Sequence, residues 1–499
     1  MTLEKIEHFV VLMEENRSFD NLLGGLYAPG ATPRGQSFEG VLGRPIALPI
    51  PPGADAEGHS SVPLQATREM HTPTPDPGEE WEHVNVQLFG AFAPEANAGL
   101  EVPQMQAPFN LPDPVPSVPP MNGFVLDYYH NYRRLTGQTP TYDQYREVMQ
   151  YFDAQALPVV STLAREFAVF DHYFAGVPSQ TFTNRSFFHA AQSSGWVDNA
   201  PYENWLKRKS NDAATIFDRL DARGRSWRVY WDPAEKVSIT ALIHFHRLWP
   251  RIRGNFRPMA EFYRDVSAGT LPEYSFIEPR FLINSNDMHP PIQAMGRTWH
   301  SSVTAGEQLV AEVYHAIRRS STAGGSNWRN TAFFLTFDEH GGNYDHVPPP
   351  AGVPPDPAEP PGQRGFRFDR LGVRIPMIVV SAYTRAGTIV SDVRDSTAFV
   401  RTLENRWGLE PLTERDRRAG DLSMAFNLET AREVDAWPEL TPIPVPEEDN
   451  SEQDLTPIGM EKMRLFAAAA ALSVTDETVD LRTVGAAMTF LKERIGRLL

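Results

Sequence analysis

The stretch TAFFLTFDEHGGNYDH, residues 331–346, joins an unbroken apolar run to an acidic, glycine-containing turn. Its first seven residues, Thr331–Phe337, are aromatic, apolar or β-branched and predict a buried strand. Asp338, Glu339 and His340 follow this strand without a spacer. Buried charges are costly unless they are paired or bind a metal, and paired glycines let the backbone approach a ligand closely. The pattern favours a functional strand end over a structural one.

The same apolar strand pattern recurs along the chain and alternates with helical patterns. Further strands are predicted at Ile6–Met13, Phe167–Phe170, Trp227–Tyr230, Tyr274–Ile277 and Ile375–Val380. Helices are predicted at Pro158–Glu166 and at Gly306–Arg319, where apolar residues recur on one face. This alternation predicts an α/β fold with a mostly parallel central sheet flanked by helices.

Proline-rich stretches interrupt this pattern. They cannot continue helices or central strands, and their aromatic and apolar content indicates long ordered loops that wrap the core. These stretches are Arg44–Pro63, Pro103–Pro120, Pro348–Pro361 and Pro438–Pro446. We expect residues 1–437 to form one catalytic domain with inserted loops. We expect residues 438–499 to form a proline-rich connector and a helical C-terminal segment that packs on this domain.

The composition excludes several kinds of site and partner. The formal net charge of −17 argues against a nucleic-acid partner and against anchoring to anionic membranes by a basic face. The absence of cysteine excludes disulfides, thiolate metal sites and cysteine nucleophiles. No apolar run approaches the roughly 20 residues of a membrane helix, and Phe9–Met13 is too short for a signal peptide. We expect a cytoplasmic protein, or a periplasmic or secreted one if a leader was removed, and the oligomeric state stays open.

Two more strand ends carry polar residues where parallel sheets bind ligands. Glu15 and Asn16 follow the first predicted strand and offer oxygen donors to a hard cation, although acidic residues also favour a plain helix N-terminus. Thr181 follows the strand at Phe167–Phe170 and precedes a helix predicted at Ser186–Ser194. A helix N-terminus favours phosphate, but Thr181 or Thr183 is equally consistent with a simple N-cap.

Four motifs together resemble a known family. The motifs are Glu15–Asp20, Thr181–Arg185, Asn286–Pro290, and Asp338–Gly342 with Asp345 and His346. In this order they are similar to the phosphoesterase family of bacterial phospholipases C and related acid phosphatases, a branch of the alkaline phosphatase superfamily. The resemblance implies an alkaline-phosphatase-like fold with a central sheet rich in parallel strands.

The resemblance also implies roles for individual residues. The matched metal ligands are Glu15, Asn16, Thr181, Asp338 and Glu339. They would hold one divalent ion, with calcium, magnesium, manganese and zinc all open. Thr181 matches the nucleophile. The matched catalytic and substrate-binding residues around the phosphate are Asn184, Arg185, His289 and His340.

The expected activity is therefore metal-dependent hydrolysis of a phosphate ester through a phospho-threonine intermediate on Thr181. We favour a phospholipase C-type phosphodiesterase, acting on a phospholipid or its head group. The alternatives are an acid phosphatase-type phosphomonoesterase and an inactive relative that binds metal and anions. Two departures from the family pattern leave the substrate open: Ser179-Gln180 replaces Gly-Pro before the nucleophile, and Glu79 replaces a histidine.

Overall fold

The computed structural model describes most of the chain. The described residues are 2–201, 203–207, 210–233, 238–281, 285–294, 297–299 and 302–445. The predicted C-terminal helical segment begins at Ile458 and lies outside these ranges. None of the helices within them combines the length and apolar character that crossing a bilayer requires.

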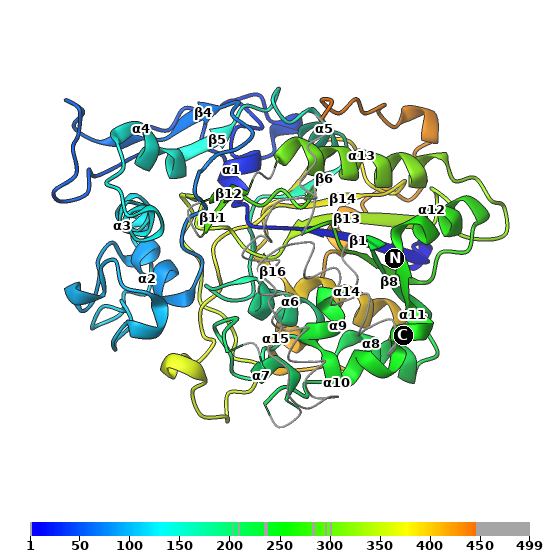
Figure 1. Ribbon diagram of the computed structural model, residues 1–499. Coiled ribbons are helices and arrows are strands. Elements are labelled where there is room, and N and C mark those ends of the chain that lie inside the picture. The colour runs from blue at the N-terminus through cyan, green and yellow to red at the C-terminus, as the bar shows by residue number, and fades with distance from the viewer. Residues whose placement is uncertain are drawn as a thin grey trace.

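An eight-stranded sheet forms the centre of the protein, in the order β15-β6-β14-β13-β1-β10-β8-β9. Its strands are β1 His8–Glu14, β6 Ala168–Phe170, β8 Trp227–Trp231, β9 Phe256–Pro258, β10 Tyr274–Ile277, β13 Thr331–Phe337, β14 Met377–Val380 and β15 Thr388–Val390. Only β14 runs antiparallel to its neighbours in this sheet. The predicted mostly parallel α/β fold is confirmed (Figure 1).

Two helical layers cover the sheet (Figure 1). One face carries α5 Pro158–Glu166, α12 Met259–Ala268 and α13 Val303–Arg319. The other face carries α6 Thr181–Ala190, α8 Ile216–Ala222, α9 Ile239–Ile243 and α14 Thr397–Trp407. Because helices cover both faces, the central strands β1 and β13 are buried along nearly their whole length and are mostly apolar instead of alternating with exposed polar residues.

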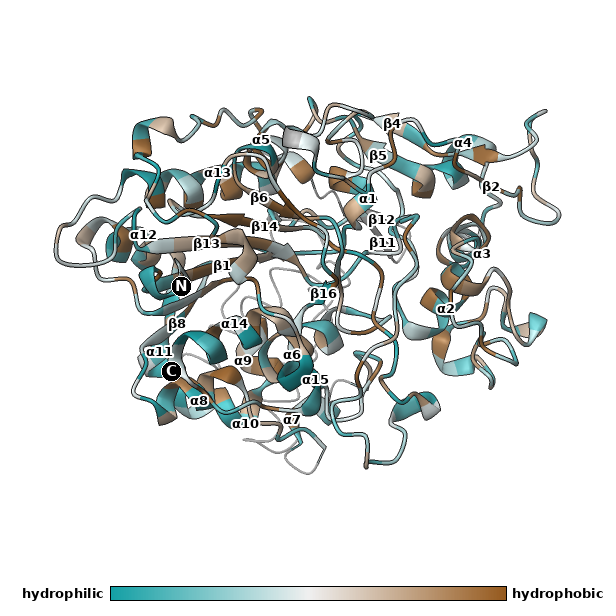
Figure 2. Ribbon diagram, turned by 180° about the vertical axis from the view of Figure 1, so that it is seen from behind, coloured by the Kyte–Doolittle hydropathy of each residue, from teal (hydrophilic) through white to brown (hydrophobic). Residues whose placement is uncertain are grey.

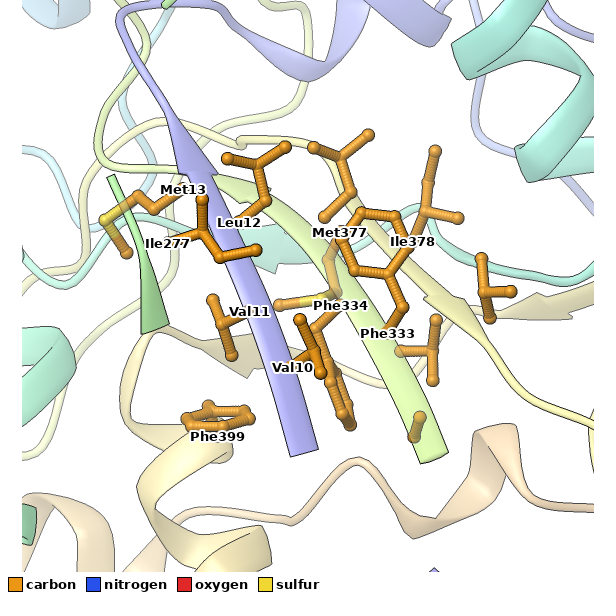
Figure 3. Packing of buried hydrophobic residues seen from close by; sticks show 14 of the residues in the cluster. Val10, Val11, Leu12, Met13, Ile277, Phe333, Phe334, Met377, Ile378 and Phe399 are labelled. Atoms are coloured by element: carbon orange, nitrogen blue, oxygen red, sulfur yellow. The ribbon is translucent and has the colours of Figure 1, made fainter. Parts of the chain in front are cut away.

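The core is densest where β1 lies between β13 and β10. Figure 3 shows the packed side chains Val10, Val11, Leu12, Met13, Ile277, Phe333, Phe334, Met377, Ile378 and Phe399. Phe399 of α14 meets Phe334 of β13 with ring centroids 5.2 Å apart in an edge-to-face arrangement. The apolar colouring of the central strands in Figure 2 follows the same core.

A smaller helical unit stands beyond the carboxyl ends of the sheet strands (Figure 1). It contains α2 Trp81–Phe89, α3 Phe124–Thr136 and α4 Tyr142–Tyr145, with the short strands β2 Ala47–Leu48, β3 Val62–Pro63, β4 Gln65–Thr67 and β5 Gln150–Phe152. It has its own buried cluster, in which Phe124, Tyr128 and Tyr145 pack together with Val84 and Leu88. This cluster holds the unit against the end of the sheet where parallel-sheet enzymes bind ligands.

Short elements complete the described chain. They are α1 Phe19–Leu23, α7 Glu203–Leu206, α10 Phe245–Leu248, α11 Ile252–Asn255, α15 Glu414–Arg418, β7 Tyr173–Phe174, β11 Ile292–Ala294, β12 Arg297–Trp299 and β16 Arg394–Asp395. Beyond residue 437, the start of the predicted connector lies on α13. There the Tyr314 hydroxyl donates to the Pro438 carbonyl at 2.8 Å.

The helix predicted at Ser186–Ser194 begins earlier and ends earlier than the sequence indicated. In the structure α6 starts at Thr181, because the amide of Asn184 already donates to the Gln180 carbonyl in the first turn. It ends before Ala191, which has a left-handed conformation with φ of 55°. The glycine at 195 suggested a later stop, but the chain turns four residues before it.

His244 is buried next to His189 of α6, and its titration makes the free energy of unfolding depend on pH. Burial lowers the pKa of His244 to about 4, although Asp218 opposes this shift. The unfolded chain binds the proton near pH 6.5, so the contribution of His244 is complete above that pH and is lost as pH falls.

When the pH is lowered from about 7.5 to about 5, protonation of His244 in the unfolded chain is expected to lower the free energy of unfolding by about 2 kcal/mol. Urea denaturation of wild type and His244→Phe at both values measures the effect, since the variant lacks the titrating group. His59→Phe, at an exposed position, is the control and should keep the wild-type pH dependence. Equal acid sensitivity of His244→Phe and wild type would contradict the assignment.

Candidate active site

The ends of β1 and β13 place their acidic residues side by side. These strands pair in parallel with Glu14 opposite Phe337, and the Asp338 amide donates to the Glu14 carbonyl at 3.2 Å. Just beyond the strands, the Asn16 amide donates to Asp338 Oδ1 at 3.1 Å. Parallel register therefore brings together residues that are 322 positions apart in the sequence.

The turn after β13 depends on glycine. Gly341 has φ of 62°, and a Cβ at this position would lie 2.1 Å from the Asn16 carbonyl oxygen. The Gly341 amide donates to Glu339 Oε2 at 2.7 Å, which fixes that carboxylate inside the site. The first of the paired glycines thus allows the close approach of the two strand ends.

Arg185 of α6 reaches across to both strand ends. Its guanidinium donates to Glu15 through Nε, at 3.0 Å, and through Nη2, and Nε lies 3.6 Å from Asp338 Oδ2. All three side chains are buried. Arg185 therefore connects the helix that carries Thr181 to the two acidic strand ends.

Thr181 is the first residue of α6, and its hydroxyl donates to Glu15 Oε2 at 3.4 Å. The N-cap is Gln180, so the simple N-cap alternative does not hold for Thr181. The neighbouring hydroxyls point elsewhere: Ser179 to the Val197 carbonyl, Thr183 to the Trp196 carbonyl and Ser186 to the Gln192 carbonyl. Of these four hydroxyls, Thr181 is the one that hydrogen-bonds to a candidate metal ligand.

Asn184 holds the loop that precedes Thr181. Its side chain accepts from the Val177 amide at 3.0 Å and donates to the carbonyls of Ser179 at 2.6 Å and Gln180 at 3.2 Å. In this arrangement the amide group positions the start of α6. Its predicted contact with a phosphate stays a prediction.

His289 and Glu79 lie next to Asn16. Glu79 accepts a hydrogen bond from Asn16 Nδ2, and His289 Nε2 lies 2.9 Å from Asn16 Nδ2 and 3.4 Å from Glu79 Oε1. Burial opposes the charged imidazole, but the Glu79 carboxylate, with Asp76 and Asp287, raises the pKa of His289 to about 10. The structure thus places Glu79 in contact with two predicted site residues, Asn16 and His289.

His340 is buried between the site and α2. Its Nδ1 lies 3.1 Å from Glu339 Oε2, and its Nε2 lies 2.8 Å from Gln87 Oε1. Burial lowers the pKa of His340 to about 3, so it is a neutral imidazole at physiological pH. A neutral imidazole carries one N–H, so the ring donates to one of these two oxygens, and its position between them links Glu339 to Gln87 of α2.

The donor set fits a hard divalent cation. Three buried oxygens at the strand ends accept no hydrogen bond from any of the described residues. They are Asn16 Oδ1, Asp338 Oδ2 and Glu339 Oε1. Burial and the charge of Asp338 raise the pKa of Glu15 well above its usual value, and burial and neighbouring carboxylates do the same for Glu339. The Arg185 guanidinium contacts two of the carboxylates, Glu15 and Asp338. Carboxylate and amide oxygens are the ligands that calcium and magnesium prefer, and zinc also accepts carboxylates.

Comparison with known proteins places the chain in a family. The model of the Phosphoesterase family matches residues 6–410, which contain the residues described above. The chain belongs to the Phosphoesterase family. It is a phosphoric ester hydrolase of α/β architecture.

Several characterised phosphoesterases are similar over most of the chain. Non-specific phospholipase C3 of Arabidopsis thaliana is 31% identical over 490 residues, covering 94% of this chain and 82% of that protein. Phospholipase C A of Mycobacterium tuberculosis is 26% identical over 466 residues, covering 86% and 78%. A solved structure of an alkaline phosphatase superfamily protein from Vibrio parahaemolyticus aligns with a TM-score of 0.32 at 14% identity, covering 63% and 81%. The fold assignment rests on the strand order described above.

A second cluster of buried charged side chains lies beside the site of this phosphoesterase and connects the turn after β13 to α1. Arg374 donates to Asp345 Oδ1 and Asp20 Oδ1, both at 2.8 Å. His346 Nδ1 lies 2.6 Å from Asp20 Oδ2, and its Nε2 lies 3.2 Å from Glu39 Oε1. The motif residues Asp345 and His346 thus join the turn after β13 to α1 and to the loop around Glu39. Arg374 pairs with the carboxylates of Asp20 and Asp345, which gives this cluster a structural role.

Sequence patterns alone did not identify several residues that contact the site. Gln87 on α2 holds His340, and Asp76 adds negative charge near His289. Glu14 is buried, and burial together with Asp287 and Glu15 raises its pKa well above the usual value. A signal was present for Glu14, which precedes Glu15 at a strand end, whereas Gln87 is one of four buried polar residues of α2 and carried no distinct signal. Their partners could not be read from the sequence because they come from distant segments.

Proposed function

We propose that this phosphoesterase is a metal-dependent phospholipase C-type phosphodiesterase that works through a phospho-threonine intermediate on Thr181. The observation that carries the proposal is the hydrogen bond from the Thr181 hydroxyl to Glu15, at the start of α6. The ends of β1 and β13 supply the cation ligands, and α6 supplies the nucleophile. The names of the relatives, phospholipases C from a plant and a bacterium, support the substrate class.

The proposed metal ligands are Glu15, Asn16, Asp338, Glu339 and the hydroxyl oxygen of Thr181. When bound, a divalent ion would lower the pKa of that hydroxyl and polarise a phosphoryl oxygen. Calcium, magnesium, manganese and zinc all fit the oxygen donors present.

Thr181 would carry the covalent step. Its Oγ1 attacks phosphorus, the bond from phosphorus to the leaving alcohol breaks, and the alkoxide takes up a proton. The hydroxyl proton of Thr181 leaves along its hydrogen bond to Glu15 Oε2. The product of this step is a phosphodiester between Thr181 and the remaining head group, with the free alcohol released.

His289 and Arg185 would stabilise the charge that builds up on the phosphoryl oxygens. Glu79 Oε1 lies 3.4 Å from His289 Nε2 and favours a proton on this nitrogen, which makes His289 the proposed donor to the leaving alkoxide. In the second step water attacks phosphorus and gives its proton to His289, the bond to Thr181 Oγ1 breaks, and this oxygen regains its proton from Glu15. Asn184 would hold the α6 start in place through both steps.

The carboxylate of Glu79 favours a diester over a monoester. A phosphomonoester carries nearly two negative charges at neutral pH and a diester carries one. Glu79 contacts Asn16 and His289, which are both proposed to face the phosphate. An additional negative charge at this position penalises a dianion more than a monoanion. The site therefore fits the monoanionic phosphate of a phospholipid.

A substrate panel tests this proposal. We expect kcat/KM for a soluble phosphocholine diester to exceed that for an aryl phosphomonoester. In Glu79→Gln, which keeps the shape and removes the charge, the diester-to-monoester ratio should fall by about tenfold or more. Steady-state kinetics on both substrates with both proteins gives the four values needed.

The same substrate panel distinguishes two alternative functions. A monoester preference in the wild type would point to an acid phosphatase-type enzyme. No phosphorus release from either substrate, with metal supplied, would point to a relative that binds metal and anions without turnover. A diester-to-monoester ratio that is unchanged in Glu79→Gln would remove Glu79 from the selection of substrate.

A further inference from the structure

A long excursion of the chain connects α2 to α3. Its two ends meet, since a Cβ on Gly123 would lie 2.9 Å from the Cα of Gly90, and the Gly123 amide donates to the Gln87 carbonyl at 3.0 Å. We call residues 90–123 the α2–α3 loop. The loop is therefore closed at α2, and its returning limb packs with Phe109 and Leu111 against the cluster that contains Trp81, Phe366 and Phe368.

Internal hydrogen bonds keep the α2–α3 loop ordered. Asn97 Nδ2 donates to the Gln106 carbonyl at 3.0 Å and to Asn110 Oδ1 at 3.1 Å, which ties the outgoing limb to the returning one. Two further bonds fix the loop to α2: Asn110 donates to the Glu82 carbonyl at 2.9 Å, and Asn85 donates to the Phe109 carbonyl at 3.0 Å. The position of the loop is therefore set by the same helix that holds His340.

The tip of this loop exposes apolar side chains. Its sequence is PDPVPSVPP, residues 112–120, in which Val115 is 45% exposed and Val118 is 65% exposed. Among the described residues, four large apolar side chains are at least 45% exposed, and two of them lie here. Five of the nine tip residues are prolines and have no backbone N–H. Such a backbone carries fewer unsatisfied donors into an apolar phase than an ordinary loop would.

The charge of the α2–α3 loop restricts its partner. Residues 91–120 contain no lysine, arginine or histidine and three acidic residues, Glu95, Glu101 and Asp113. Arg134 of α3 pairs with Glu101 at 2.8 Å. The chain as a whole carries a net charge of −17. An anionic surface would therefore repel this face, whereas a zwitterionic surface without net charge would accept its valines and prolines.

The loop lies at the same end of the molecule as the proposed site. Its supporting helix α2 begins two residues after Glu79, and Gln87 on that helix lies 2.8 Å from His340. Figure 1 shows α2 and α3 beyond the carboxyl ends of the sheet strands, where Glu15 and Asp338 lie. A surface that binds the tip would thus face the end of the molecule that carries the proposed site.

We propose that the tip of the α2–α3 loop docks this enzyme on a zwitterionic phospholipid surface by inserting Val115 and Val118 among the head groups. The proposal rests on the proposed phospholipase C function, since docking would present head groups to Thr181. It assigns surface binding to the loop and bond cleavage to the sheet. The two activities should therefore be separable by mutation.

The double variant Val115→Asp/Val118→Asp tests the docking surface. In co-flotation with phosphatidylcholine vesicles we expect its vesicle affinity to fall by about tenfold or more, because two apolar anchors become charged. Hydrolysis of vesicle phosphatidylcholine should fall in parallel. The value of kcat/KM for a soluble phosphocholine diester should stay within about twofold of wild type, since the tip does not contact the proposed site.

The chain offers a matched control pair elsewhere on its surface. Val393 is 49% exposed and Met424 is 45% exposed, and Arg394, next to Val393, lies 3.4 Å from the Met424 sulfur. The double variant Val393→Asp/Met424→Asp adds the same charge to another apolar pair and should bind vesicles like wild type. Any loss of binding caused by added negative charge alone would appear equally in this control.

Several results would overturn the docking proposal. These are vesicle binding by the tip variant equal to wild type, no binding of wild type to phosphatidylcholine vesicles, or binding that requires anionic phosphatidylglycerol. Vesicle-free self-association of wild type that the tip variant abolishes would assign the surface to a second protein copy instead. If vesicle binding follows expectation but no protein hydrolyses either diester, the proposed function fails and the docking surface stands.

Discussion

Replacing Thr181 by valine is expected to lower kcat by at least about a thousandfold while the protein stays folded, because the nucleophilic oxygen is lost and the shape is kept. Thr181 starts α6, and its hydroxyl faces Glu15 at 3.4 Å. Loss of this oxygen also removes one proposed metal ligand, but four others remain. Metal content should therefore change much less than turnover. Kinetics with the soluble diester and elemental analysis of the same sample measure both quantities.

Thr183→Val is the matched control for this experiment. Thr183 lies one position beyond Phe182 in the same helix, and its hydroxyl donates to the Trp196 carbonyl at 3.4 Å, away from the strand ends. We expect its kcat to stay within about threefold of wild type, since it loses one weak hydrogen bond. Trapping of wild type with a slow substrate, followed by mass spectrometry, should locate phosphorus on Thr181. Near wild-type turnover by Thr181→Val would show that water is the nucleophile.

Removal of metal is expected to abolish activity, and Asp338→Ala is expected to lose both metal and activity. Asp338 Oδ2 and Glu339 Oε1 are buried oxygens to which no other described group hydrogen-bonds, so a chelator leaves these carboxylates without their cation. Re-addition of a divalent ion should restore the wild type and raise its Tm, because binding to the folded state alone stabilises it. It should restore neither property in Asp338→Ala. Titration with each candidate ion also identifies the metal.

Glu307→Gln provides the control for a buried carboxylate outside the site. Glu307 on α13 accepts the backbone amides of Val159 and Val160 at 3.2 and 2.7 Å. Its replacement is expected to lower Tm without changing the metal content per folded molecule. Full activity of a chelated, metal-free wild type would refute the proposed chemistry, whatever the behaviour of the variants.

Much of the fold could be predicted from local sequence. The strands at Tyr274–Ile277 and Thr331–Phe337 and the helix at Pro158–Glu166 have the bounds expected from their apolar patterns. The edge strands β9 and β15 were not expected, since they are three residues long and carry no distinct pattern. Short edge elements depend on the neighbouring strand for their hydrogen bonds, so local propensity says little about them.

The site was predictable to the extent that the sheet is parallel. Polar residues at the carboxyl ends of parallel strands must meet, which is why Asp338 and Asn16 were expected together. Local sequence could not show which hydroxyl faces the site. The direction in which the start of the helix points each side chain decides this for Ser179, Thr181, Thr183 and Ser186. That direction depends on Asn184, which ties the loop before α6 to its first turn.

The sequence by itself determined the strand and helix pattern, the α/β class and the candidate residues at three strand ends, because these depend on local periodicity and on residue chemistry. Only the tertiary structure decided that Arg185 connects α6 to Glu15 and Asp338, that Glu79 contacts His289, and that Gln87 holds His340. These pairs come from segments that the chain brings together only on folding. Their energies depend on burial and distance, which no single segment specifies.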